Sequence, residues 1–206
     1  MINPTRIELR QSKTRLKSAI AGHKLLKDKL DEMVRRFLQL SRSAVQLRID
    51  VEAQLTAALK SYALARAAGG GQTIDAALCM PTQPLGIEIS SLSIMGVQTP
   101  LIRPIDKDGK ITKLPYALAA APIELYNAVI KFYAVIQRLL QLAEVEKTCA
   151  LLADEMQKTR RRVNALEYVL IPDLRQTIKY IQMKLDENDR ANLARLMKVI
   201  TTDDNA

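Results

Sequence analysis

Apolar residues recur along the first part of the chain at steps that alternate between three and four. Eleven of the thirteen positions in this series are apolar, the exceptions being His23 and Gln54. A heptad spacing of this kind marks one narrow stripe along an α-helix, which is typical of a helix that packs against a partner helix. The series is Leu16, Ala19, His23, Leu26, Leu30, Met33, Phe37, Leu40, Ala44, Leu47, Val51, Gln54 and Ala58.

One very long helix is expected to carry this stripe. Asn3 before Pro4, or Thr5 with Glu8, predicts its start within the first few residues. Consecutive glycines at residues 69–71 predict its end near residue 67 or 68, because they make continued helix costly. At about 1.5 Å of rise per residue, residues 4–66 would span roughly 95 Å, so we expect a rod.

The middle of the chain has a different period. Residues 73–80 are compatible with a short helix, which the prolines that follow would close. Ile87 and Ile89 then alternate with Glu88 and Ser90, Leu92, Ile94 and Val97 follow, and Pro100 and Pro104 are expected to end this run. We interpret it as a small β-hairpin that lies against the helices or a partner, since an isolated hairpin is marginally stable in water. A turn is expected at residues 106–109.

A second heptad series follows, on a helix expected over residues 123–200 and about 110 to 120 Å long. Its spacing slips at Leu142 and Val145, which indicates a local overwinding of the coiled coil. Pro172 lies inside the series and cannot donate to the carbonyl of Tyr168, so we expect a kink there and not an end. The series is Leu125, Val129, Phe132, Ile136, Leu139, Leu142, Val145, Cys149, Leu152, Met156, Thr159, Val163, Leu166, Leu170, Leu174, Ile178, Ile181 and Leu185.

These patterns predict a mainly α fold, in which two very long helices form an antiparallel coiled coil with a small β-hairpin and a short helix between them. Two long helices joined by a compact segment must run antiparallel to bury each other's stripes, and both termini then lie at one tip. The expected divisions are residues 1–68 for the first long helix, 69–117 for the middle segment and 118–206 for the second long helix.

The net charge of +9 is concentrated in the first helix. Residues 1–66 hold 14 Lys and Arg against 6 Asp and Glu, a balance of +8. Such a helix suits an acidic protein surface, an anionic membrane surface or nucleic acid. Basic residues scattered around the helix and an aromatic content of 4% weigh against nucleic acid. No apolar run long enough for a membrane span and no signal peptide is present, so we expect a cytosolic protein.

Residue types that carry chemistry are few. The single histidine, His23, has no second His or nearby Cys for catalysis or metal binding, which favours a packing or partner-contact role. Glycines 69–71 are not followed by the Gly-Lys-Ser/Thr of a phosphate loop, and residues 106–109 lack most calcium ligands. Cys79 and Cys149 show no metal-ligand spacing. We therefore predict no catalytic residue, no cofactor and no metal.

Several motifs closely resemble the D subunit of the V-type and A-type rotary ATPases. They are NPTR at residues 3–6, GHKLLKDK at 22–29, EVEKT at 144–148, KTRRRVNALEY at 158–168 and IP at 171–172. The motifs cover both long helices, whereas residues 69–115 match only in their hairpin character.

The resemblance implies a non-catalytic central rotor shaft. In that family the paired terminal helices stand inside a ring of three catalytic A and three non-catalytic B subunits, an F subunit binds alongside, and a C (or d) subunit links the base to the ion-carrying membrane ring. The implied location is the cytoplasmic face of a membrane, without insertion and without nucleic acid. The candidate contacts with the ring are Arg6, Arg10, Lys13, Arg160, Arg161, Arg162 and Lys198.

Two alternatives stay open on the residues alone. A basic coiled-coil adaptor or nucleic-acid-binding rod would also use the charged first helix. For the cluster at residues 160–162, pairing with Glu155 or Glu167 competes with contact to a surrounding protein, because consecutive residues fan over about 200° of a helix and cannot all serve one site.

Overall fold

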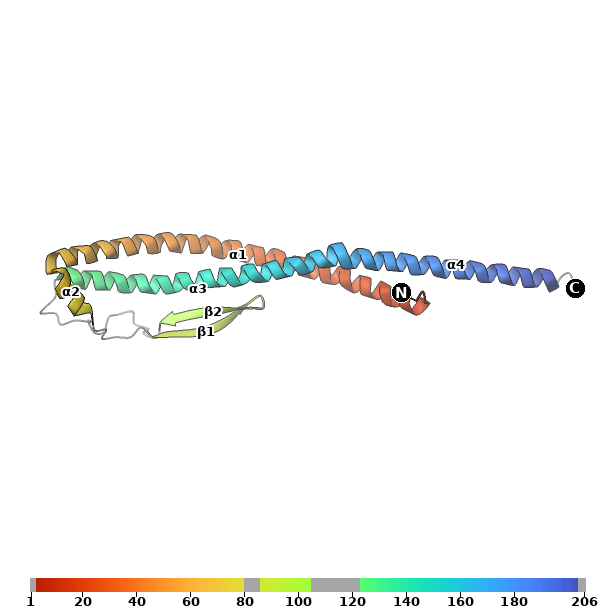
Figure 1. Cartoon of the computed structure of the whole chain (residues 1–206), viewed down its shortest axis with the longest axis horizontal. Helices are drawn as coiled ribbons and strands as arrows, with labels where there is room; N and C mark the ends of the chain where they lie inside the picture. The colour runs from red at the N-terminus through yellow and green to blue at the C-terminus, as the bar shows by residue number, and fades with distance from the viewer. Residues whose placement is uncertain (1–2, 80–85, 105–122, 204–206) are drawn as a thin grey trace. The chain divides into compact units, whose positions relative to one another are not determined.

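The computed structural model describes residues 3–79, 86–104 and 123–203, with side chains described up to residue 198 (Figure 1). The elements in chain order are helix α1 (Arg6–Gly69), helix α2 (Gly71–Leu78), strands β1 (Ile87–Ile94) and β2 (Val97–Pro104), helix α3 (Ile123–Ala165), a π-helical turn (Leu166–Leu170) and helix α4 (Ile171–Asp203). The fold is mainly α with one small hairpin, as predicted. It divides into two compact units, residues 33–155 and residues 1–32 with 156–206.

Helix α1 begins at Arg6 because Thr5 caps it. The hydroxyl of Thr5 accepts a hydrogen bond of 3.2 Å from the backbone N–H of Glu8, which satisfies one of the N–H groups that a helix start leaves without a helical partner. Of the two predicted starts, the one at Thr5 is therefore correct. The helix then continues without interruption to Gly69.

The predicted stripe on α1 is the buried face of the helix. All thirteen residues of the first heptad series are buried or half-buried, and Ala19, Met33, Val51 and Ala58 are the most enclosed. Larger apolar residues just beside the stripe, such as Leu38 and Val45, are about half exposed or more. The heptad spacing thus identified the packing face correctly.

In the unit of residues 33–155, α1 and α3 run antiparallel. Arg48 pairs with Glu146 at 2.5 Å, and farther along α1 the hydroxyl of Ser61 accepts a hydrogen bond of 2.6 Å from Lys131. The rings of Tyr62 and Phe132 meet edge to face, with their centroids 6.3 Å apart. Because residue numbers fall on α3 as they rise on α1, these contacts confirm the predicted direction.

The buried stripe of α3 differs in part from the second predicted series. Ala128 and Val135 are almost fully buried, whereas Leu139 remains 41% exposed. Val129 and Ile136, which the series placed in the stripe, are half-buried beside them. Ala128 and Val129 are both apolar, as are Val135 and Ile136. Periodicity alone therefore could not identify which residue of each pair faces α1. The series was wrong at Leu139.

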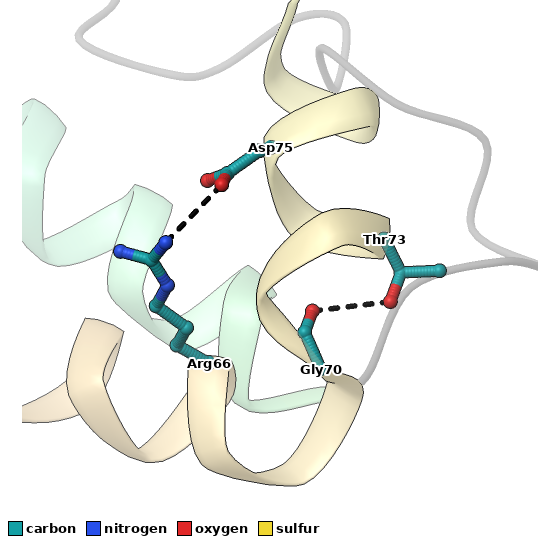
Figure 2. Close-up of polar contacts among 4 residues, drawn as sticks. All are labelled: Arg66, Gly70, Thr73 and Asp75. Carbon is teal, nitrogen blue, oxygen red and sulfur yellow. Dashed lines mark hydrogen bonds and ion pairs between the residues drawn. The ribbon is translucent and has the colours of Figure 1, made fainter.

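A sharp reversal at Gly70 joins α1 to α2 (Figure 2). Gly70 has φ of +76°, a left-handed conformation that side chains with a Cβ atom rarely adopt. The hydroxyl of Thr73 donates to the carbonyl of Gly70 at 3.1 Å, and Arg66 pairs with Asp75 at 3.2 Å. Ala65, Ile74 and Leu125 form a small core there.

The hairpin is built on a two-residue turn, Met95 and Gly96, both with positive φ. Ile94 pairs with Val97, and the register runs back to Ile87 opposite Pro104. The expectation that the run would end at Pro100 was wrong, since Pro100 lies inside β2, whereas the strand does end at Pro104. A proline is tolerated in an edge strand where its missing N–H faces away from the neighbouring strand.

The predicted turn at residues 106–109 lies outside the described residues, as does the segment before Ile123.

The C-terminal helical segment passes Pro172 through the π-helical turn. The N–H of Ile171 donates to the carbonyl of Leu166, five residues earlier, instead of four. The wider turn accommodates the missing N–H and the bulk of the following Pro172. The extra residue in this turn shifts the buried face by one position. Ile171 is therefore buried, whereas Leu170, which the heptad series placed in the stripe, is 42% exposed. The helix continues beyond proline, as predicted.

Candidate functional site

In the unit that combines the two ends of the chain, α1 runs antiparallel to the segment after residue 156. Arg6 lies 3.4 Å from Asp189, and His23 lies 3.2 Å from Glu167. Since the first residue of α1 is level with Asp189, residues 190–203 of α4 continue past the start of α1. Leu193, Leu196 and Met197 on this extension are more than half exposed.

Four basic residues follow one face of the first turns of α1. Arg6, Arg10, Lys13 and Lys17 are spaced by four, three and four residues, which keeps their side chains on one side of a helix. Together with Leu9 and Thr14 they form one open surface on this helix. We call these four residues the basic stripe.

The basic stripe corrects one interpretation of the sequence. Basic residues are scattered around α1 as a whole, but on its first turns four of the five, all except Arg15, share one face. Lys17 was not among the predicted site residues, although its spacing from Arg6, Arg10 and Lys13 is visible in the sequence. A search for charged residues at helical spacing would have identified it.

Ion pairing leaves most of this charge facing solvent. The side chains of Arg6 and Asp189 are 80% and 58% exposed, and a pair as exposed as this contributes little stability. Arg10, Lys13 and Lys17 are also exposed. The basic stripe therefore presents a solvated surface of one sign, suited to meeting an acidic protein surface.

The remaining predicted site residues occupy other parts of the same unit. Arg160, Arg161 and Arg162 are exposed on α3, and Lys198 is exposed near the end of α4. Of the acidic residues considered as partners for the arginine cluster, Glu167 contacts His23. Consecutive positions on α3 point these arginines in different directions, so the structure does not gather them into one site. Their contact with a partner stays a prediction.

His23 lies against a helix, as its place in the heptad series indicated. Its side chain is 20% exposed and its Nε2 atom is 3.2 Å from the carboxylate of Glu167. A cross-helix pair of this kind positions two helices relative to each other. Neither catalysis nor metal binding is needed to explain it.

Other chemistry is scarce in the described parts of the chain. Among residues 3–79, 86–104 and 123–198, no group of three or more His, Cys, Asp or Glu could hold a metal ion. The described helices include none with the length and apolar character to cross a membrane. Burial, and secondarily the carboxylate of Glu146, raise the pKa of the Cys149 thiol, which disfavours the reactive thiolate.

Comparison with known proteins assigns the family. The family model that describes the ATP synthase D subunit matches residues 8–201. The V-type ATP synthase D subunit of Acetivibrio thermocellus is 47% identical over 199 residues, which is 96% of this chain and 90% of that protein. The D subunits of the V-type ATP synthases of Clostridium novyi (46% over 202 residues; 97% and 94%) and Clostridium botulinum ATCC 19397 (45% over 201 residues; 96% and 93%) are similar over nearly their full lengths. These matches favour the rotary-ATPase interpretation over a free-standing or nucleic-acid-binding rod, and the chain belongs to the family of ATP synthase D subunits, the central-stalk subunits of V-type ATP synthases.

Proposed function

We propose that this protein is a non-catalytic shaft whose terminal helices turn inside a ring of A and B subunits. The observation that carries the proposal is the basic stripe, four cations on one exposed face of α1. A surface of one charge on one side of a helix is rotationally asymmetric. It can interact differently with each surrounding subunit and so favour a different conformation in each.

The chemistry of the basic stripe identifies the surface it would meet. Arg presents a planar fork that pairs with carboxylates, and Lys supplies a mobile point charge. Acidic side chains on the inner wall of the ring would satisfy both. Contacts of this kind are reversible and weakened by salt, which suits a surface that must be released at each step of rotation.

The proposal extends to the other predicted partners. An F subunit would bind alongside the long helices, and a C (or d) subunit would link the base of the shaft to the membrane ring. Apolar side chains left exposed along α1, among them Val34, Leu38, Val45 and Ile49, are available for a partner helix. The protein would then be held on the cytoplasmic face of the membrane by its partners.

Reversing the charge of the basic stripe tests the central claim. Arg10→Glu with Lys13→Glu should weaken assembly with the A and B ring at low salt and lower the ion transport obtained for each ATP hydrolysed. Arg42→Glu with Lys60→Glu makes the same charge change at exposed positions farther along α1 and serves as the matched control. Equal effects of the two double variants, or a binding affinity that salt does not change, would contradict the proposal.

The non-catalytic role has its own test. The purified chain should hydrolyse no ATP above background, and adding it to the A and B ring should change the ring's turnover. ATP hydrolysis by the chain alone would refute this part. A salt titration against DNA and RNA would show whether the basic stripe also binds nucleic acid, which would appear as a steep loss of affinity with salt.

A further inference from the structure

We propose that the coiled coil has a bending joint at one level, formed by Gly22 and His23 on α1 and by the π-helical turn Leu166–Leu170 on the facing segment. The contact between His23 and Glu167 places these two stretches side by side, with Nε2 and Oε2 3.2 Å apart. Each stretch is a weak point of its own helix, and their coincidence at one level is the basis of the inference.

The facing segment is weak because its hydrogen-bond ladder changes there. The Ile171 N–H reaches back five residues to Leu166, and the next residue, Pro172, has no N–H to donate. Mid-helix π turns and prolines are the usual places where helices bend. None of the residues in this turn is buried, and Tyr168 and Val169 are 72% and 67% exposed. The turn therefore has little packing to hold it straight.

Helix α1 is weak at the same level because of Gly22. Glycine is among the least favourable residues in a helix interior, since it loses the most backbone freedom on folding. A close approach of the facing helix would explain a glycine at this position. However, a Cβ atom built on Gly22 meets nothing within 4 Å. Close packing therefore does not explain the glycine, which leaves its effect on the flexibility of the helix.

Firmer packing lies on both sides of this level. Ala19 on α1, and Val163 and Ile171 around the π-helical turn, are each less than 10% exposed. Between them the polar contact from His23 to Glu167 spans the two helices. This polar contact holds the two sides of the joint together. A bend at this level would separate the two side chains without unfolding the packed turns on either side.

Hydrogen exchange of the full chain, followed residue by residue, tests the joint. Residues 19–26 and 164–174 should exchange faster than residues 12–18 and 175–182, although the latter are nearer the helix ends. Fraying from the ends predicts the opposite order. Protection that falls steadily toward the chain ends, with no minimum at Gly22 and the π-helical turn, would overturn the proposal.

Two substitutions test whether the two stretches act together. Gly22→Ala should slow exchange by roughly fivefold on α1 and also at residues 164–174, the factor expected from restoring alanine's helix propensity. Glu167→Gln, with His23→Gln as a second variant, should speed exchange in both stretches while the thermal midpoint changes little. Ser18→Ala, one turn from Gly22, is the matched control. Effects confined to the substituted helix would show two independent defects and refute the joint.

Discussion

The carboxylate of Glu144 on α3 accepts a hydrogen bond of 3.1 Å from the backbone N–H of Ile102 on β2. This contact attaches the hairpin to the helices of its unit, next to a small cavity lined by Leu40, Leu92 and Leu101. It also occupies an N–H on the outer edge of β2, where Pro100 and Pro104 have none to offer. The hairpin therefore has a defined anchor.

Glu144→Ala should release this anchor. The part-buried N–H of Ile102 would lose its acceptor, which costs about 1 to 3 kcal/mol for a buried donor left without a partner. We expect faster hydrogen exchange on both strands and a lower free energy of unfolding, measured by urea titration. Lys147→Ala, on an exposed position of the same helix, should change neither quantity. Unchanged strand exchange in Glu144→Ala would disprove the anchoring role.

Gly70→Ala should destabilise the reversal between α1 and α2. A Cβ atom at φ of +76° stores strain of about 1 to 3 kcal/mol. Thermal or urea unfolding should show the loss directly. Gly22→Ala provides the opposite comparison, because Gly22 lies within a helix with open space around it and should gain about 0.5 to 1 kcal/mol. The same sign for both substitutions would contradict this account.

Val135→Ala and Leu139→Ala should separate the buried stripe of α3 from its exposed flank. Val135 is 1% exposed and its truncation should cost about 2 kcal/mol through lost burial and a residual cavity. Leu139 is 41% exposed, so removing its larger side chain should cost less. Urea titration of the two variants gives the comparison. A greater loss of unfolding free energy in Leu139→Ala than in Val135→Ala would show that Leu139 belongs to the buried stripe, as the heptad series predicted.

The two cysteines should differ in reactivity and in its dependence on pH. Burial beside Glu146 raises the pKa of the Cys149 thiol, so less thiolate forms at a given pH than at an ordinary cysteine. Cys79 is exposed. Alkylation followed by mass spectrometry should label Cys79 first, with the reaction of Cys149 rising only at higher pH. Glu146→Gln removes one cause of the raised pKa, so Cys149 should react at a lower pH in this variant than in the unmodified protein. Faster labelling of Cys149 at neutral pH would show that its side chain is not shielded.

The sequence by itself determined the long helices and the face of α1 that packs. Heptad spacing is a local property, and on α1 the series of three and four runs unbroken from Leu16 to Ala58, although larger apolar residues such as Leu38 and Val45 lie beside it. The break at the triple glycine and the hairpin in the middle of the chain were readable for the same reason, and the sequence narrowed the start of α1 to Asn3 or Thr5. Each depends on residues that are adjacent in the chain.

Only the tertiary structure decided which residue is buried where two neighbouring residues suited the apolar stripe equally well. Ala128 and Val129 both suit a buried stripe, and the position of α1 selects Ala128. Pro172 predicts a disturbed helix but not the π-helical turn that moves burial from Leu170 to Ile171. The contacts of His23 with Glu167 and of Ile102 with Glu144 join residues more than 40 positions apart. Local periodicity carries no information about such pairs, because they depend on how separate helices and strands align in space.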